Sequence, residues 1–474
     1  MRPHLWSPWK SAGTEPSRLA VVAGSQSCTF GELTARADAL ARGLRARGLP
    51  DGSVLSTDIP TGPRFFALAL AALAHGYGLF PVEAGLLRSP TGSRLLADMR
   101  VALHVTSWPA EQCAGTPPHP VADDETLVDA GTSDSPVPLR ASVAAGYLAF
   151  ATSGTTGVPQ AVPRVRPARP YLGVAVEERY AAGPSVGPHL MANPTYHLGT
   201  LGPALYALQA GSTVVVQQEW SASEFTTLAD RHAVASTMLS PDLLVDIVRA
   251  GRAPAQPLRA VFHGGASCPP AVKRAAIGLL GPVLHEYYGT SRSILTEIGT
   301  PQWLTHPGSV GRALPGITLT VERDGEHLPA GAPGEITARL RAADSASGSD
   351  GVLRTGDLGY LDEDGYLYVL GRMGTSGGHD EALLEHLVRQ LPGVTDVAVI
   401  GGPTGPASVC HVETPVTQDA AGLVAAIGAA TAAWGLPLPQ VVPHPSGSLP
   451  RTPSGKIRRA ALASDGAGTG QRHR

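Results

Sequence analysis

Apolar residues recur at helical spacing near the start of the chain, where Leu33, Leu40 and Leu44 would share one face of a helix. Gly48 and Pro50 follow this run, and both residues are typical of the end of a helix. We therefore predict a helix that begins just after residue 29 and ends before residue 48.

Strand-like and helix-like patterns then alternate. The apolar run over residues 53–58 predicts a strand, and the stretch from Phe65 to Leu79 predicts a buried helix. That stretch carries His75 and falls short of the roughly 18 apolar residues that a membrane span needs. Alternation of strands and helices is typical of parallel sheets with helices on their faces. We predict an α/β fold, with a large N-terminal domain of α/β layers that contain parallel sheets.

A change of pattern near residue 373 predicts a second domain. Met373 is followed by a Gly-rich and Ser-rich stretch, beyond which helix and strand signals resume over about 90 residues, the size of a small domain. We expect this part to be a small, mobile α+β C-terminal domain. The predicted division is a core domain over 1–371, a hinge over 372–378, a C-terminal lid domain over 379–464 and a disordered tail over 465–474.

Composition excludes several classes of protein. A chain of 474 residues is too long for one ordinary core, and its formal net charge of −3 gives no basic surface for nucleic acid. The four cysteines are far apart and form no CxxC pair, which fits a reducing compartment. With neither a signal peptide nor a membrane span evident in the sequence, we predict a cytoplasmic protein with no nucleic-acid or membrane partner. The sequence leaves the oligomeric state open.

The stretch Thr152–Pro159 carries the strongest local signal for chemistry. It follows the apolar run Tyr147–Ala151, which predicts a buried strand, and it combines glycines with several hydroxyl side chains. Such a loop turns sharply and offers backbone N–H groups to the oxygens of a polyphosphate. A surface turn rich in Ser and Thr is the alternative interpretation.

A second signal is the scarcity of lysine. Lysine and arginine together number 36, yet lysine stands only at Lys10, Lys273 and Lys456. Lys456 lies in the stretch Pro450–Ile457, and its compact, flexible ammonium differs chemically from a planar guanidinium. This placement hints at a chemical role for Lys456.

With these two stretches and several others in the same order, the chain resembles the AMP-forming adenylating enzymes. That family includes acyl-CoA and aryl-CoA ligases, luciferase and the adenylation domains of nonribosomal synthesis. The stretches that carry the resemblance are Thr152–Pro159, Asn193–His197, Gly264–Ala266, Glu286–Ser291, Gly308–Arg312, Gly334–Ile336, Thr355–Asp357, Gly371–Arg372 and Pro450–Lys456.

The resemblance implies a two-domain fold, ATP and Mg²⁺ as cofactors, and a role for each matching residue. It implies that Lys456, Ser291 and His197 take part in catalysis, with Lys456 bridging the carboxylate and the α-phosphate. The residues that it places around ATP or AMP are Thr152, Ser153, Gly154, Thr155, Thr156, Gly157, Gly264, Gly265, Ala266, Glu286, Tyr287, Tyr288, Gly289, Thr290, Asp357 and Arg372. The residues that it places in the substrate pocket are His197, Tyr196, Phe262 and Gly289.

Two of these assignments bear on the substrates. Asp357 would accept hydrogen bonds from both ribose hydroxyls, with Arg372 nearby, and either Tyr287 or Tyr288 would cover adenine. His197 stands where members that activate amino acids carry an aspartate for the α-ammonium group. A neutral histidine there favours an aryl, alkyl or enoic acid without an α-amino group, although a histidine of the core is the alternative.

The chain departs from the family at three places. Gln160 stands where the phosphate loop usually ends in lysine, and Arg292 stands where a glutamate usually binds Mg²⁺. A guanidinium cannot bind a metal, which leaves Glu297 as a weak candidate and the metal ligands unknown. The hinge lacks the usual acidic residues and Ile-Lys pair, so formation of the adenylate is better supported than formation of a thioester.

These observations favour an ATP-dependent, AMP-forming ligase that adenylates a small carboxylic acid and transfers it to a thiol or amine. Coenzyme A, a carrier protein or an amine could be the acceptor. One alternative is the activation of a small inorganic oxyanion such as nitrite, for diazotisation of an arylamine. Another is a degenerate nucleotide-binding protein without turnover, which Gln160 and Arg292 favour and Lys456 and Asp357 oppose.

Overall fold

The computed structural model divides into two compact units. The residues that it describes are 8–108, 120–132, 139, 146–152, 160–164, 181–192, 196–290, 292–340, 351–373, 379–401, 408–415, 419–432, 436–451, 457–459 and 461–462. The first unit consists of Met1–Thr152, Val158–Met238 and Pro254–Val261, and the second of Ser153–Gly157, Leu239–Ala253 and Phe262–Arg474. The domain boundary expected at 372–378 is not tested by this division and stays a prediction.

The first unit contains two groups of mostly parallel strands. In one sheet the strands lie in the order β6-β5-β3-β4-β7-β8, and in the other group the order is β11-β9-β10-β1-β2. The described strands are β1 (Leu19–Ala23), β2 (Gln26–Thr29), β3 (Val54–Thr57), β4 (Gly78–Pro81), β5 (Val101–Thr106), β6 (Val121–Asp123), β7 (Tyr147–Ala151), β8 (Ala161–Arg164), β9 (His189–Met191), β10 (Val214–Val216) and β11 (Ser236–Leu239). All neighbouring pairs are parallel except β1 with β2 and β7 with β8. The prediction of an α/β fold with parallel sheets is confirmed.

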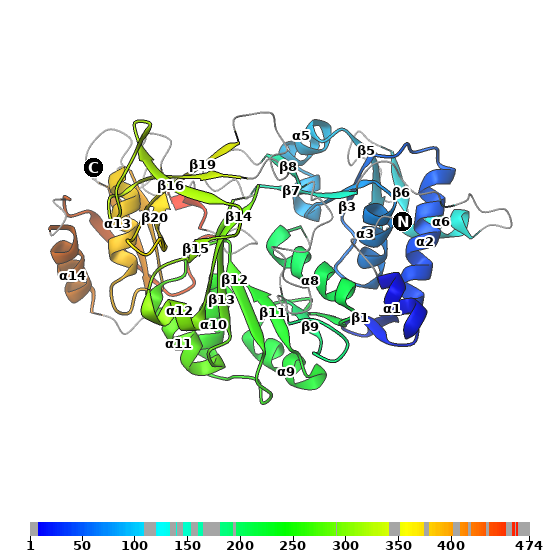
Figure 1. Ribbon diagram of the computed structural model, residues 1–474, viewed down its shortest axis with the longest axis horizontal. Coiled ribbons are helices and arrows are strands. Elements are labelled where there is room, and N and C mark those ends of the chain that lie inside the picture. The colour runs from blue at the N-terminus through cyan, green and yellow to red at the C-terminus, as the bar shows by residue number, and fades with distance from the viewer. Residues whose placement is uncertain are drawn as a thin grey trace, which may run out of the picture. The chain divides into compact units, whose positions relative to one another are not determined.

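Helices connect these strands (Figure 1). The described helices of the unit are α1 (Pro8–Thr14), α2 (Phe30–Ala46), α3 (Pro63–Ala74), α4 (Ala84–Leu87), α5 (Pro90–Asp98), α6 (Asp124–Gly131), α8 (Leu198–Ala210) and α9 (Ala222–His232). Thr29 caps α2: its hydroxyl accepts from the amide of Glu32, and the Glu32 carboxylate accepts from the amide of Thr29. The helix predicted after residue 29 is thus present.

The helix predicted over Phe65–Leu79 is shorter than expected. It ends at Ala74, Gly76 takes a positive φ of 81°, and Leu79 belongs to strand β4. The sequence is apolar throughout because α3 and β4 are both buried, so hydrophobicity alone cannot separate them.

Helices α2 and α6 meet through glycine. A Cβ atom on Gly43 would lie 2.0 Å from the carbonyl oxygen of Leu127, and one on Gly131 would lie 1.9 Å from that of Ala39. Two backbones in direct contact leave no room for any other residue at either position.

The second unit is built from helices and mostly antiparallel strands, with β22 and β23 as a parallel pair. Strand β12 (Ala260–Gly264) straddles the division. Five strands form a sheet in the order β17-β16-β18-β19-β20, and β13, β14 and β15 form antiparallel pairs. The described elements are α10 (Pro241–Ala250), α11 (Pro270–Leu280), β13 (Leu284–Gly289), β14 (Ile294–Gly299), α12 (Thr300–Thr305), β15 (Arg312–Ala313), β16 (Thr318–Arg323), β17 (Glu326–His327), β18 (Gly334–Arg339), β19 (Val352–Leu361), β20 (Leu367–Arg372), α13 (His379–Arg389), β21 (Asp396–Ile400), β22 (Val409–Thr414), α14 (Ala420–Ala432) and β23 (Gln440–Pro445).

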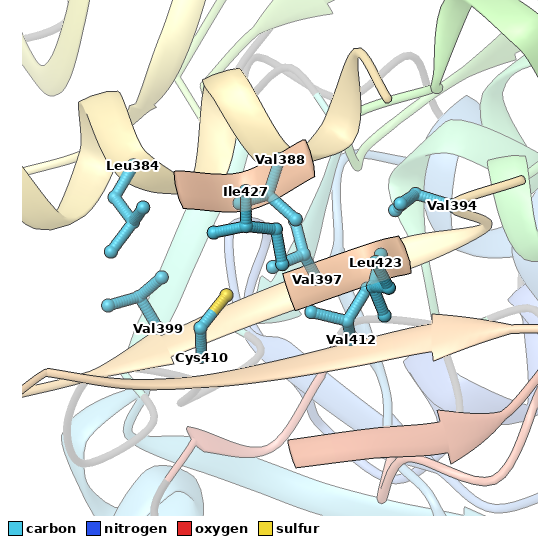
Figure 2. Close-up of a cluster of buried hydrophobic side chains, with 9 residues drawn as sticks. All are labelled: Leu384, Val388, Val394, Val397, Val399, Cys410, Val412, Leu423 and Ile427. Atoms are coloured by element: carbon cyan, nitrogen blue, oxygen red, sulfur yellow. The ribbon is translucent and has the colours of Figure 1, made fainter. Parts of the chain in front are cut away.

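The C-terminal part of this unit has a hydrophobic cluster of its own. Figure 2 shows Leu384 and Val388 of α13 facing Val397 and Val399 of β21, with Cys410 of β22 among them. Leu423 and Ile427 of α14, together with Val394 and Val412, complete the cluster. The strands β21, β22 and β23 form a three-stranded sheet. Helices and strands thus pack together in this part of the chain, while the lid domain expected over 379–464 stays a prediction.

Candidate functional site

The carboxylate of Asp357 is held from two sides in the second unit. The hydroxyl of Tyr288 donates to Oδ2 at 2.7 Å, and Nη1 of Arg372 donates to Oδ1 at 3.0 Å. Asp357 on β19 and Arg372 on β20 are direct partners in the antiparallel register. Each carboxylate oxygen keeps a further lone pair, so Asp357 can still accept two hydrogen bonds from a ligand.

Arg372 is fixed by the strand that it faces. Its Nη1 also donates to the carbonyl oxygen of Thr355 at 2.5 Å, and its guanidinium lies against Gly356. Gly356 has a φ of 69°, and a Cβ atom there would lie 3.2 Å from Nη2 of Arg372. The glycine between Thr355 and Asp357 therefore supplies both the backbone conformation and the space for the arginine.

Tyr288 remains a hydrogen-bond donor at any ordinary pH. Burial raises the pKa of Tyr288 well above its usual value, and the negative charge of Asp357 raises it further. Tyr287 points to the other side of β13, where its ring is buried and stacks on Phe262 with centroids 5.6 Å apart. Of the two adjacent tyrosines, Tyr287 is thus part of the core and Tyr288 faces Asp357.

Phe262 is also a residue of the core. Its side chain is fully buried and packs against Tyr287 and His285. The structure brings Phe262 together with Tyr287, and the place of Phe262 in a substrate pocket stays a prediction.

Glycines allow close contacts beside Tyr287 and Tyr288. A Cβ atom on Gly264 would lie 2.6 Å from the carbonyl oxygen of Tyr287, and one on Gly289 would lie 2.3 Å from that of Ser293. Gly265 has a φ of 86° and is exposed. Gly264 thus lets β12 lie close to β13, and Gly289 lets the end of β13 lie close to Ser293. At Gly265 the positive φ, and not a close contact, favours glycine.

Glu286 forms a buried ion pair that the sequence analysis did not predict. Nζ of Lys273 on α11 donates to Oε2 of Glu286 at 2.6 Å, and the Lys273 side chain is fully buried. The ammonium also lies 5.0 Å from the ring centroid of Trp303. Burial raises the pKa of Glu286, and the charge of Lys273 opposes that rise. The scarcity of lysine singles out Lys273 in the sequence, but nothing in the sequence pairs it with Glu286.

Glu297, the candidate metal ligand, lies on the face of the sheet opposite to that of Tyr288. It pairs with Tyr287 across β13 and β14, and residues directly opposite each other share a face. Its Oε1 lies 3.5 Å from Nδ1 of His285. Among the described residues, no group of three or more His, Cys, Asp or Glu side chains could hold a metal ion. The metal ligands therefore stay unknown.

In the first unit, Thr152 closes the base of the predicted phosphate loop. Its amide donates to the carbonyl oxygen of Gln160 at 2.7 Å, and its hydroxyl accepts from the amide of Gln160 at 2.9 Å. Residues 153–159 between them lie outside the described residues, as do Ser291 and Lys456. The ends of the loop are antiparallel neighbours, as β7 and β8 are.

His197 and Tyr196 lie together at the start of α8. His197 is the N-cap residue of that helix, and its ring centroid lies 4.8 Å from that of Tyr196. Burial raises the pKa of Tyr196 to about 12, with a further contribution from the charge of Glu83. Both side chains are half-buried, so the pair has an exposed part that a ligand could contact.

Comparison with known proteins gives one consistent result. The sequence profile of the AMP-binding enzyme family matches residues 8–342. The chain is 31% identical over 415 residues to a sulfoacetate–CoA ligase of Cupriavidus necator, which covers 79% of this chain and 80% of the relative. It is 27% identical to an indoleacetate–CoA ligase of Aromatoleum aromaticum, and the match covers 96% of each chain.

Solved structures agree in fold. The o-succinylbenzoate CoA synthetase of Bacillus subtilis in complex with its acyl-adenylate intermediate has a TM-score of 0.77 at 23% identity, and the match covers 97% of this chain and 98% of the other. The amide bond synthetase of Marinactinospora thermotolerans has a TM-score of 0.75 at 24% identity, covering 98% and 99%. Among the residues described here, no helix is both long and apolar enough to cross a membrane.

Proposed function

Because this chain belongs to the AMP-binding enzyme family and is an AMP-forming acid ligase with a thiol or amine acceptor, we propose that it adenylates a small carboxylic acid without an α-amino group. The observation that carries the proposal is the carboxylate of Asp357, held by Tyr288 and Arg372 with two acceptor positions left. A vicinal diol such as that of ribose matches two acceptor positions on one carboxylate.

The class of substrate is supported by the relatives. Their names specify sulfoacetate, 2-succinylbenzoate and indoleacetate, and none of these acids carries an α-amino group. His197, at the position where a carboxylate would hold an α-ammonium group, supports the same class. We propose that His197 and Tyr196 contact the acid.

The proposed reaction has two steps. A carboxylate oxygen of the acid attacks the α-phosphorus of ATP, the bond from that phosphorus to the bridging oxygen breaks, and pyrophosphate leaves. A thiol or amine then attacks the acyl carbon, loses its proton, and AMP leaves. Both partners of the first step are anions, so Lys456 would contribute by placing a positive charge between them.

ATP fits the described residues, whereas Mg²⁺ has no evident site among them. Asp357, Arg372 and Tyr288 would hold the nucleoside, and the loop that starts at Thr152 would hold phosphate oxygens. Mg²⁺ often keeps several waters and binds through substrate phosphates with few protein ligands. We propose that it arrives with ATP, in accord with Arg292 at the usual glutamate position.

The test is a screen for pyrophosphate release across sulfoacetate, 2-succinylbenzoate, indoleacetate, α-amino acids and nitrite. Each acid is combined with coenzyme A, a carrier protein or an arylamine, and products are identified by mass spectrometry. Release with an acid that lacks an α-amino group supports the proposal. Release with nitrite alone favours oxyanion activation, and ATP binding without any release favours a degenerate protein.

A further inference from the structure

The chain around Lys456 is held at both ends by backbone pairing. Arg451 and Ile457 form an antiparallel bridge, and the amide of Arg458 donates to the carbonyl oxygen of Pro450 at 2.7 Å. Lys456 directly precedes Ile457, so their Cα atoms are about 3.8 Å apart. Contacts that fix this bridge therefore fix Ile457, the residue to which Lys456 is directly bonded.

Arg451, at one end of the bridge, is anchored by two carboxylates. Nη1 donates to Oδ2 of Asp396 on β21 at 2.8 Å, and Nη2 donates to Oε2 of Glu413 on β22 at 2.7 Å. The other oxygen of Glu413 accepts from the amide of Leu449 at 2.7 Å. Glu413 therefore holds both the side chain of Arg451 and the backbone that leads to it.

Arg459, beyond the other end, is anchored by a different acid. Its Nη2 lies 2.7 Å and 2.8 Å from the two oxygens of Glu385 on α13. Glu385 also accepts from the amide of Val399 on β21 at 2.8 Å. The side chain of Ile457 is buried between these anchors and packs with Leu449. The chain before and after Lys456 is thus fixed to β21, β22 and α13.

Stability alone does not account for these ion pairs. The side chains of Glu413 and Glu385 are only 2% and 6% exposed, and burying a charge costs free energy that its partner merely offsets. Well-packed apolar residues would stabilise such a site about equally. Charge-assisted hydrogen bonds differ from apolar contacts in fixing direction and distance. The benefit of the arrangement is therefore geometric.

We propose that Glu413 and Glu385, through Arg451 and Arg459, are positioning residues that hold Lys456 where it acts on the α-phosphate. The inference rests on the proposed function of Lys456. A displacement of about 1 Å of a catalytic group can cost on the order of 100-fold in rate, so loosening either anchor should slow adenylation.

The first experiment measures ATP–pyrophosphate exchange in Glu413→Gln and Glu385→Gln. Both variants keep the shape of the side chain and remove its charge. We expect kcat to fall about 10-fold or more while KM for ATP changes less than about two-fold. The matched control is Asp124→Asn, because Asp124 is a fully buried acid that Arg36 and Arg64 hold in the first unit. The control should lose stability and keep its kcat at a temperature where it is folded.

The second experiment uses the scarcity of lysine and needs no activity. Lys10 is exposed to an amine-reactive reagent, whereas Lys273 is fully buried in its ion pair, so Lys10 serves as the reference for labelling at Lys456. Mass spectrometry gives the rate of labelling at Lys456 relative to Lys10. We expect this ratio to change at least about three-fold in both variants, and to stay constant in Asp124→Asn.

The results separate the inference from the proposed function. An unchanged labelling ratio, or a kcat loss in the Glu413 variant no larger than that of Asp124→Asn, overturns the positioning role. If Lys456→Ala alone keeps normal exchange, the proposed role of Lys456 fails, while the labelling ratio still decides whether the acids position it. The double variant Lys456→Ala with Glu413→Gln tests whether Glu413 acts through Lys456. Residual activity equal to that of Lys456→Ala alone supports this route. A further loss as large as that of Glu413→Gln alone contradicts it.

Discussion

Tyr288 donates its phenolic hydrogen to Asp357, with 2.7 Å between Oη and Oδ2, and thereby connects β13 to β19. The carboxylate is oriented before any ligand binds, because Arg372 holds its second oxygen. An acceptor that is already fixed in place loses little conformational freedom when a ligand binds.

Replacement of Asp357 should weaken ATP binding more than it slows chemistry. Contacts to ribose are made about equally in the ground and transition states, so Asp357→Ala should raise the apparent Kd for ATP about 10-fold or more with a smaller effect on kcat. Titration calorimetry with ATP measures the change. Tyr288→Phe, which keeps the carboxylate and removes one donor to it, should have a weaker effect. Unchanged affinity in Asp357→Ala would remove Asp357 from the nucleotide site.

Replacement of Lys456 should have the opposite kinetic signature. Its charge would act mainly on the transition state, so Lys456→Ala should lower kcat by roughly 100-fold or more and leave ATP binding largely intact. Pyrophosphate release and ATP titration, measured on the same preparation, separate the two effects. Near-normal release would show that Lys456 is not part of the mechanism.

The ion pair between Lys273 and Glu286 should matter for stability. Lys273→Met leaves a buried carboxylate without its partner, and such losses cost about 3–5 kcal/mol. The double variant Lys273→Met with Glu286→Leu removes both charges and should recover most of that free energy of unfolding. Urea denaturation of the three proteins tests this expectation. A double variant as unstable as the single variant would contradict it.

His189 should make the protein less stable in mild acid. It is fully buried, and burial lowers its pKa from the ordinary 6.5 to about 4. As pH falls below about 6.5, His189 binds a proton in the unfolded chain but not in the folded chain. The contribution of neutral His189 to the free energy of unfolding is therefore fully present above pH 6.5 and is lost progressively down to about pH 4. The loss is on the order of 3 kcal/mol. The difference between the wild type and His189→Gln in denaturant unfolding at several pH values isolates this histidine. Parallel pH profiles would refute the assignment.

The acceptor is predicted from the hinge sequence. Residues 373–379 lack the acidic residues and the Ile-Lys pair that the family resemblance led us to expect there, so we expect AMP and pyrophosphate to form readily but coenzyme A to be a poor acceptor. A second step requires the nucleophile to reach the adenylate at near-attack distance. Rates should improve with a dedicated carrier protein or a small amine, as measured by product formation with each acceptor at saturation. Efficient acyl-CoA formation would overturn this prediction.

The sequence predicted the elements whose pattern is local. The apolar run Tyr147–Ala151 is strand β7 with the same bounds, because Gly146 precedes it and polar residues with a glycine follow it directly. The helix expected from Phe65 to Leu79 was too long, since both α3 and β4 are buried on all sides. Local patterns cannot show a boundary between two equally apolar elements.

The contacts of the candidate site could be predicted only in part. The family resemblance named Asp357, Arg372 and Tyr288, and the structure brings these three together. It did not name Lys273, whose partner lies 13 residues away on a different element. The side of the sheet on which Glu297 lies depends on the register of β13 with β14, and register is set by the whole sheet.

The close contact between α2 and α6 can be recognised from sequence alone, because it requires glycine on both helices. Gly43 and Gly131 each oppose a carbonyl oxygen of the other helix at a distance that excludes even a methyl group. The residue type at position 43 and the residue type at position 131 both depend on the distance between the two helices, so we expect the two to change together. In relatives of this chain, the two glycines should be kept or lost together. A relative that has lost both should also show a different spacing of α6 from α2.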